Sequence, residues 1–382
     1  MKKNYNYLVL MLGFAGFVSA ADNWFVSPAL PAIAKNFSVT SAIAATIITS
    51  YMAPYGLLQP VYGFFADKFS KESVLKLIIT GLTIGTLLSA LSPTLSILNL
   101  TRGITGFFAA GIIAVSLALI GDMVPRELAQ NYVGKFMGIV FLGQGLSAGM
   151  GGLLTKYINW RASFLFFALL AFLSAIILYL KLPNRKRISI ISPKGNFFKI
   201  LFNIINTPKG RVIFPLAAIA GFLILGVYSY LGAYFVDKIG LDYLQSGLII
   251  MFYGFACLLG GNIAGKIHLQ KMQTIILGEI LSLCTIILLY FAHSWILCII
   301  GVMLLGFGYI FVQSTLATAA FYVSETDKGL SSGLIGTGLF TGGSLGSLFG
   351  ALILSTLNFN YFLAIFGVLI LILTVLTFSI KL

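Results

Sequence analysis

Charged side chains are scarce in this chain. Only 9% of its residues are charged and 59% are hydrophobic, whereas a typical soluble domain contains about 25% charged residues. The chain therefore has too little charge to cover a folded surface in water. Because long apolar stretches recur from end to end, the composition predicts an all-α protein that crosses a membrane many times.

Residues that bind metals or form disulfides are also rare. The chain contains three cysteines and two histidines. The cysteines lie inside apolar segments without the spacing of metal ligands, so we expect small buried hydrophobic residues. A nucleotide-binding motif of the Walker type is absent from the sequence, as is any Cys/His or Ser/His/Asp combination. We therefore expect no metal, no cofactor and no enzymatic activity.

The apolar segments predict twelve transmembrane helices of about 20 residues or more. They lie near residues 7–33, 41–66, 74–92, 95–122, 130–155, 160–182, 211–237, 243–265, 272–292, 294–322, 329–355 and 360–380. A basic segment, 183–210, separates six helices from six. The predicted domains are thus an N-terminal bundle at 1–182, a cytoplasmic linker at 183–210 and a C-terminal bundle at 211–382.

The positive charges predict the orientation. The net charge is +14, and 19 of the 24 lysines and arginines fall in segments on the side of the N-terminus. The positive-inside rule therefore places both termini and the linker in the cytoplasm. We expect a multi-pass protein of the cell inner (cytoplasmic) membrane. This topology accounts for the positive net charge, so nucleic-acid binding is not needed to explain it. The basic linker can contact anionic membrane lipids. The first apolar run resembles a secretory signal but continues to Ala34, so we expect a retained helix.

The two halves repeat each other. A constant spacing of 198 residues relates Tyr55-Gly56 to Tyr253-Gly254, and Gly63 to Gly261. The same spacing relates Gly138, Gly145 and Gly152 to Gly336, Gly343 and Gly350. Two parallel six-helix units predict a transporter with its site at the midplane between them.

Two charged residues lie inside predicted transmembrane helices of the N-terminal half. Arg102 is within 95–122, where a buried guanidinium costs about 2.5–3.5 kcal/mol and is normally paired or directed into a cavity. Asp22 is in the middle of the first helix. We expect these residues to couple transport to protons. A structural ion pair is the alternative for Arg102, and contact with a cationic substrate is the alternative for Asp22.

Three further sets of residues are candidates for functional roles. Gly63, Asp67, Lys68 and Lys71 in "GFFADKFSK" predict a conformational latch at the cytoplasmic side; a solvated turn is the alternative. Small residues let helices approach closely, so we expect helix seams at Gly145, Gly149, Gly152, Gly343 and Gly350. An aromatic substrate cavity with few polar groups is predicted from Asn23, Trp24, Tyr51, Tyr55, Gln144, Tyr228, Tyr253 and Gln313. Static packing is the alternative for both sets.

These motifs resemble those of the major facilitator superfamily, in particular its twelve-helix drug:proton antiporter branch. "GFFADKFSK" is similar to the family's loop 2–3 motif, with Ser70 in place of a usual Gly and Glu72 where a base is common. "RGITGFFAAG" is similar to the helix 4 motif, with Arg102 and Gly106 matching and Thr105 in place of a usual Gln. In that family the arginine is linked to proton coupling.

Two further stretches resemble motifs of exporters. "GLSAGMGG" is similar to the antiporter motif of helix 5, although Met150 replaces the usual Pro. "ADNWFVSPALP" is similar to the helix 1 motif of drug exporters, in which an acid, here Asp22, precedes the proline of "ALP", here Pro31.

The resemblance covers essentially the whole chain. It implies a monomeric secondary transporter that works by alternating access and exports small lipophilic or amphiphilic molecules against a flow of protons. The alternatives are a proton-coupled transporter of a polar metabolite, such as a sugar or amino acid, and a receptor or scaffold that kept the fold without transporting.

Overall fold

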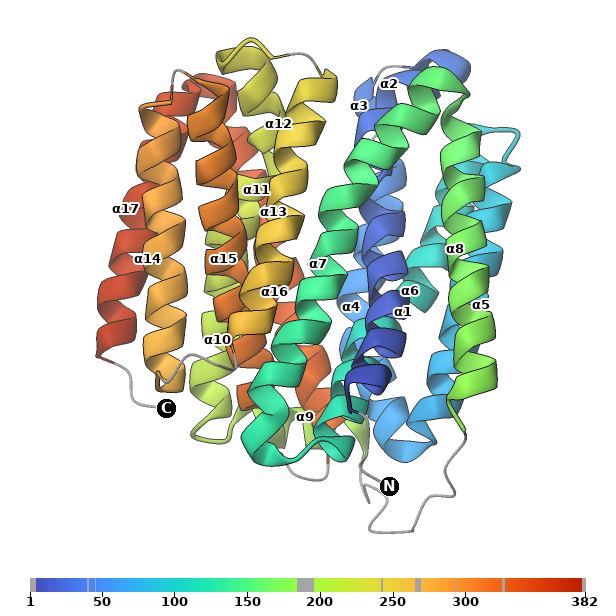
Figure 1. Ribbon diagram of the computed structural model, residues 1–382, viewed down its shortest axis with the longest axis vertical. Helices are drawn as coiled ribbons and strands as arrows, with labels where there is room; N and C mark the ends of the chain where they lie inside the picture. The colour runs from blue at the N-terminus through green and yellow to red at the C-terminus, as the bar shows by residue number, and fades with distance from the viewer. Residues whose placement is uncertain are drawn as a thin grey trace.

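The computed structural model describes residues 5–39, 41–44, 46–183, 196–241, 243–264, 269–292, 294–324 and 327–379. Within these ranges the chain forms helices joined by short turns, without a strand. Two groups of helices stand side by side, and α1 begins at the same end of the molecule at which α17 ends (Figure 1). We call this the inner end, since the charge pattern predicts it to be cytoplasmic, and we call the opposite end the outer end.

The N-terminal half consists of helices that follow the predicted segments closely. Its elements are α1 (Tyr5–Trp24), α2 (Val26–Asn36), α3 (Ser41–Ala44), α4 (Thr46–Lys68), α5 (Lys71–Ala90), α6 (Leu95–Met123), α7 (Arg126–Tyr157) and α8 (Trp160–Lys181). Side-chain caps define several starts: Ser70, Thr94 and Asn159 each accept a hydrogen bond from the main-chain N–H three residues later.

The C-terminal half has the same general plan. Its elements are α10 (Gly210–Ala220), η1 (Gly221–Leu225), α11 (Gly226–Ser229), α12 (Leu231–Ala233), η2 (Tyr234–Lys238), α13 (Tyr243–Ala264), α14 (Lys271–Tyr290), α15 (Trp295–Ala320), α16 (Lys328–Thr356) and α17 (Phe359–Phe378).

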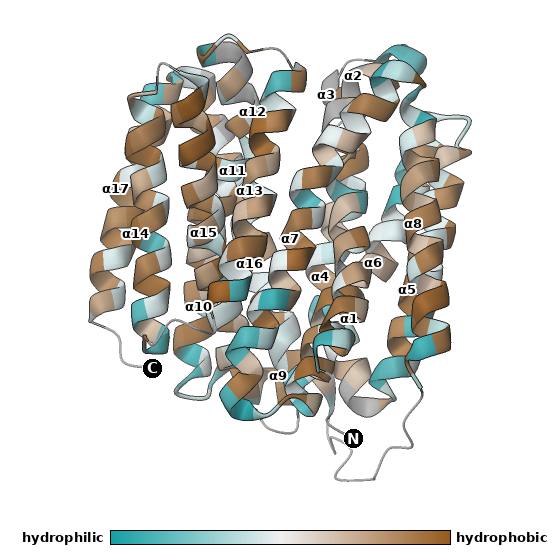
Figure 2. Cartoon of the chain, viewed as in Figure 1, coloured by the Kyte–Doolittle hydropathy of each residue, from teal (hydrophilic) through white to brown (hydrophobic). Residues whose placement is uncertain are grey.

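Eleven helical stretches among the described residues are long and apolar enough to cross a membrane. Apolar residues cover most of their length, and hydrophilic residues gather toward the two ends (Figure 2). The predicted second span, α4, is not among the eleven. It carries Pro54 and Pro60 but packs against α6 and α16 as an integral part of the bundle.

Two predicted helices are interrupted. The first is interrupted at Phe25, and Pro28 falls in the first turn of α2. Proline is tolerated there because main-chain N–H groups of the first turn make no hydrogen bond within the helix. The seventh contains two π-helical segments, η1 and η2, and a turn at Tyr230. Single π-helical turns add a residue to the helix and are common at functional sites.

The linker contains a short helix that the sequence analysis missed. Helix α9 (Phe197–Ile205) is capped by Asn196, and its Phe197 ring packs on Phe64 of α4, with ring centroids 5.4 Å apart. Phe198 and Phe202 are exposed. The basic residues at 184–195 lie outside the described part of the chain.

Candidate functional site

A buried ion pair joins α1 to α6. Arg102 Nη1 donates to Asp22 Oδ2 at 2.7 Å, and Arg102 Nη2 donates to the main-chain oxygen of Asp22 at 3.1 Å. Exposure of the two side chains is 0% for Arg102 and 1% for Asp22. Thr86 of α5 donates to the other carboxylate oxygen at 2.7 Å. The two charges, which are 80 residues apart along the chain, therefore neutralise each other inside the N-terminal half. Thr86 is 64 residues from Asp22.

Aromatic rings enclose the guanidinium of Arg102. Its central carbon lies 4.3 Å from the ring centroid of Tyr51 and 5.6 Å from that of Phe164. Tyr51 is held by a hydrogen bond from its hydroxyl to Ser19 O at 3.2 Å. Both carboxylate oxygens of Asp22 thus have partners within the N-terminal half.

The residues beside the ion pair reach that interface. Trp24 meets Tyr228 of α11, with ring centroids 5.4 Å apart. Tyr51 stacks on Tyr55 at 5.6 Å, and Tyr55 meets Phe340 of α16 at 5.0 Å. Asn23 donates to Met52 Sδ at 2.9 Å. Residues close to the charged pair on α1 and α4, such as Trp24 and Tyr55, thus contact the C-terminal half.

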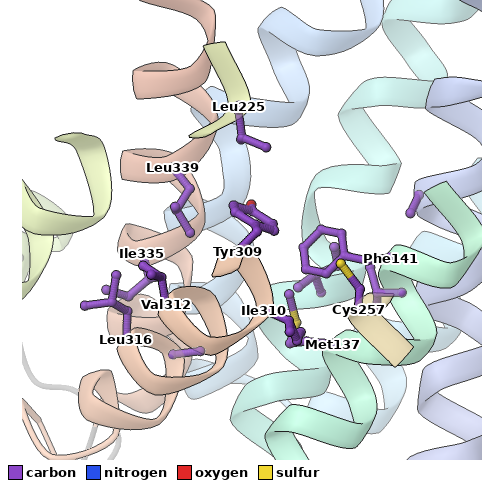
Figure 3. Close-up of a cluster of buried hydrophobic side chains, with 14 of the residues drawn as sticks. Met137, Phe141, Leu225, Cys257, Tyr309, Ile310, Val312, Leu316, Ile335 and Leu339 are labelled. Carbon is purple, nitrogen blue, oxygen red and sulfur yellow. The ribbon is translucent and has the colours of Figure 1, made fainter. Parts of the chain in front are cut away.

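A cluster of aromatic rings lies between the halves. The distances between ring centroids are 4.5 Å for Tyr228 and Tyr253, 6.2 Å for Tyr253 and Tyr309, and 4.9 Å for Tyr309 and Phe141 of the N-terminal half. The rings of Phe141 and Tyr309 point toward one another, next to Cys257 (Figure 3). Tyr253 and Tyr309 are fully buried. The structure therefore brings predicted cavity residues together and adds Phe141.

Several polar atoms in and beside this cluster have no hydrogen-bond partner in the described part of the chain. They are the hydroxyls of Tyr253 and Tyr309, Nε2 of Gln144 and Oε1 of Gln313. Gln313 is one turn beyond Tyr309 and therefore shares its face of α15. Buried polar groups are normally paired, so this group of unpaired donors and acceptors is suited to a hydrogen-bonding ligand. Among the described residues, no cluster of His, Cys, Asp or Glu is suited to a metal.

Close main-chain contacts join α7 to α13. A Cβ atom at Gly145 would lie 2.9 Å from Gly254 Cα, and one at Gly134 would lie 2.4 Å from Gly261 O. Gly149 packs on the side chain of Met251. The two helices diverge toward the outer end (Figure 1). The predicted seam at Gly145 and Gly149 of α7 thus borders α13. Gly152 is half-buried, and its neighbour Gly151 packs on Phe25.

The second seam is formed by different glycines from those predicted. Gly343 faces Leu225, and Gly350 faces Tyr230 and Phe362, all in the C-terminal half. The contact between α16 and α4 lies nearer the inner end, where a Cβ at Gly63 would lie 2.0 Å from Gly329 O. A spacing of seven residues drifts around a straight helix by about 20° per repeat, so a glycine series need not follow one neighbour.

Asp122 takes part in two ion pairs at the inner end, and the one with Lys328 connects the halves. Asp122, at the end of α6, pairs with Lys71 at 2.9 Å and with Lys328 of α16 at 3.2 Å. Lys328 also donates to Gly121 O at 2.9 Å. Of the predicted latch, Gly63 and Lys71 lie in this region, but the side chains of Asp67 and Lys68 lie outside the described part of the chain. Charge alone did not reveal that Asp122 and Lys328 are partners.

Comparisons with known proteins agree with this architecture. The family model described as Major Facilitator Superfamily matches residues 12–320. The uncharacterized MFS-type transporter YwfA of Bacillus subtilis is 26% identical over 84% of this chain and 79% of its own length. The efflux pump dotC of Dothistroma septosporum is 27% identical over 76% of this chain, which spans about half of that longer protein (47%).

A solved structure shows the same fold. The human organic anion transporter MFSD10 (TETRAN) superposes with a TM-score of 0.78 and covers 98% of this chain and 100% of its own, at 15% identity. With its repeated halves, apolar helices and family match, this multi-pass membrane protein belongs to the major facilitator superfamily of transporters.

Proposed function

We propose that the protein is a proton-coupled exporter of small lipophilic or amphiphilic compounds and works by alternating access. The observation that carries the proposal is the buried Asp22–Arg102 pair, whose neighbours Trp24 and Tyr51 lead to the aromatic cluster between the halves. The efflux function of dotC, a relative of low identity, agrees with it.

Coupling follows from the electrostatics of the pair. Protonation of Asp22 would leave the guanidinium of Arg102 buried without a counter-charge, and breaking a buried pair in this way is strongly unfavourable. The cation would have to move or be solvated, and its contact with Tyr51 would change. Because Tyr51 stacks on Tyr55, which meets Phe340 of the other half, proton binding would bias how the halves pack.

The proposed substrate site is the aromatic cluster of Trp24, Tyr228, Tyr253, Tyr309 and Phe141. Aromatic surface with a few convergent polar groups is typical of sites for small amphiphilic ligands. No charged side chain belongs to this cluster among the described residues. The proposed inner-end latch, formed by Lys71, Asp122 and Lys328, would hold the halves together while the site opens toward the outer end.

A proton-coupled transporter of a polar metabolite is the second candidate. It is favoured by the four unpaired polar atoms of Gln144, Tyr253, Tyr309 and Gln313. A sugar or an amino acid needs such donors and acceptors, whereas a lipophilic compound needs few of them.

Transport by purified protein in proteoliposomes under an imposed pH gradient tests the proposal. The panel contains tetraphenylphosphonium, a neutral aromatic dye, glucose and an amino acid. Gradient-driven movement of the first two supports export of lipophilic compounds, and movement of only the last two supports the second candidate. Glu127→Gln, which removes an exposed carboxylate at the inner end, should behave as the unmodified chain. Equal transport with and without the gradient would contradict coupling in either form.

A further inference from the structure

Glu279 is a second buried acid, far from the proposed coupling pair. It lies on α14 with 1% of its surface exposed. Helix α14 packs against α15 and α17, at the edge of the molecule away from the N-terminal half (Figure 1). Neither the aromatic cluster nor the Asp22–Arg102 pair includes α14. The role of Glu279 therefore needs its own explanation.

The carboxyl group has hydroxyl neighbours, and no described cation lies beside it. Thr377 Oγ1 lies 3.1 Å from Glu279 Oε1, while Oε2 has no hydrogen-bond partner. The helices packed against it, α15 and α17, contain no charged residue. Lys271, on α14 itself, is two turns away and lies over the Tyr322 ring at 4.0 Å. The other titratable groups on the neighbouring elements are Cys284, Tyr290, Cys298, Tyr309, Tyr361, Tyr234 and Lys238.

The hydroxyl of Thr377 has only one proton to donate. Its oxygen also lies 2.9 Å from Leu373 O, a main-chain oxygen that can only accept. Thr374 bonds in the same way to Ile370 O at 2.9 Å. Thr86 has the same two neighbours, Asp22 Oδ1 at 2.7 Å and Leu82 O at 2.9 Å, but there Arg102 supplies a positive charge that stabilises an ionised carboxylate. Because the described residues place no such charge beside Glu279, a proton on its carboxyl group is what lets Thr377 keep its bond to Leu373 O and still accept from Glu279.

We propose that Glu279 is a proton-binding site in which the neutral carboxylic acid donates to Thr377 and fastens α14 to α17. An ionised carboxylate would take the hydroxyl of Thr377 away from Leu373 O and would have no counter-charge among the described residues. An uncompensated charge is costly in this apolar setting. The proton on Glu279 therefore stabilises the contact between α14 and α17 in the C-terminal half. This role is independent of Asp22.

Infrared spectroscopy of the full chain in lipid nanodiscs tests the proposal directly. At neutral pH we expect a carbonyl stretching band of a protonated carboxylic acid. The band should be lost in Glu279→Gln and retained in Asp22→Asn. A spectrum in which Glu279→Gln leaves the band unchanged, or a wild-type spectrum without it, would overturn the proposal, whatever the outcome of the transport assays.

Stability against pH provides a second, independent measurement. If the folded chain holds a proton that the unfolded chain gives up, stability falls as the pH rises. The glutamine amide can donate to Thr377 at any pH, so Glu279→Gln should lose this part of the pH dependence and still fold. Glu279→Ala, which leaves Thr377 without a donor, should have lower thermal stability than Glu279→Gln. Equal pH slopes for wild type and Glu279→Gln would refute the proposed site.

Discussion

At the residue scale, the proposed proton coupling depends on how Asp22 is held. Its two carboxylate oxygens meet Arg102 and Thr86, which come from two different helices. Breaking a buried ion pair by removing one partner typically costs about 3–5 kcal/mol. Arg102 is further stabilised by the faces of Tyr51 and Phe164, since cations are attracted to aromatic rings. The pair is thus a buried arrangement that one proton can disturb, and Nε of Arg102 has no hydrogen-bond partner among the described residues.

Thr86 gives a prediction at this scale. Thr86→Val removes the donor to Asp22 Oδ1, and a hydrogen bond to a charged group contributes about 1.5–3 kcal/mol. We expect a lower thermal unfolding temperature in detergent for Thr86→Val. Thr86→Ser keeps the hydroxyl and should stay close to wild type. Equal destabilisation by both substitutions would show that the hydroxyl of Thr86 does not support the pair.

The sequence identified some of these residues and not others. A carboxylate and a guanidinium stand out in apolar helices because isolated charges are costly there, which is why Asp22 and Arg102 were predicted. Threonine is common in such helices, so the sequence did not indicate that Thr86 contacts Asp22. Asp122 and Lys328 sit among other interfacial charges, and only the fold shows that they meet.

At the element scale, main-chain contacts bring the halves together. Along α4 and α16, Thr337 donates to Gly56 O at 3.0 Å, and Gly63 lies against Gly329. Along α7 and α13, glycines from both helices face each other. Small residues allow backbones to approach this closely. Both contacts must open if the site is to face the inner end.

Gly63→Ala is the corresponding prediction. The added Cβ would lie 2.0 Å from Gly329 O, so α4 and α16 have to separate and the inner-closed conformation becomes less populated. Gly56→Ala is a matched control on the same helix, because nothing lies within 4 Å of its Cβ position. Spin labels at Glu127→Cys and Leu269→Cys, in a background without the native cysteines, should report a longer distance for Gly63→Ala only. An unchanged distance would contradict this view of the contact.

The sequence predicted the elements well but not their interruptions. Long apolar segments gave the helices, and capping residues mark several starts. The break at Phe25 and the π-helical segments depend on packing, which the apolar pattern does not encode. Helix α9 was missed because its nine residues lie in a basic linker. The regular spacing of Gly343 and Gly350 did not reveal that they face their own half.

At the scale of the whole molecule, the structure is closed at the inner end. Lys328 links the halves through Asp122, which is 41% exposed. Exposed pairs contribute about 1 kcal/mol or less and are weakened by salt. This contact can therefore bias the conformational equilibrium without locking it.

Lys328→Gln tests this bias. We expect the inner-closed population to fall by about fivefold or less, the equivalent of about 1 kcal/mol. The difference from wild type should shrink at high salt, because the wild-type pair is then screened. The same pair of spin labels measures both effects. A large change that persists in high salt would mean that Lys328 acts through packing.

The fold class was predictable at this scale because twelve apolar segments, a basic linker and a constant repeat spacing leave few architectures open. The conformational state was not, because one sequence encodes every conformation that the protein can adopt. The contacts of Gly63 and Lys328 show the state only in three dimensions.

The central claim is that Asp22 carries the coupled proton. Its most direct test follows the internal pH of proteoliposomes while they transport the compound that the wild-type protein moves fastest. The account predicts substrate-dependent proton movement in the wild type and none in Asp22→Asn. The variant should still exchange labelled substrate between the two sides without a pH gradient, which shows that it is folded. Proton movement in Asp22→Asn equal to that of the wild type would contradict the account.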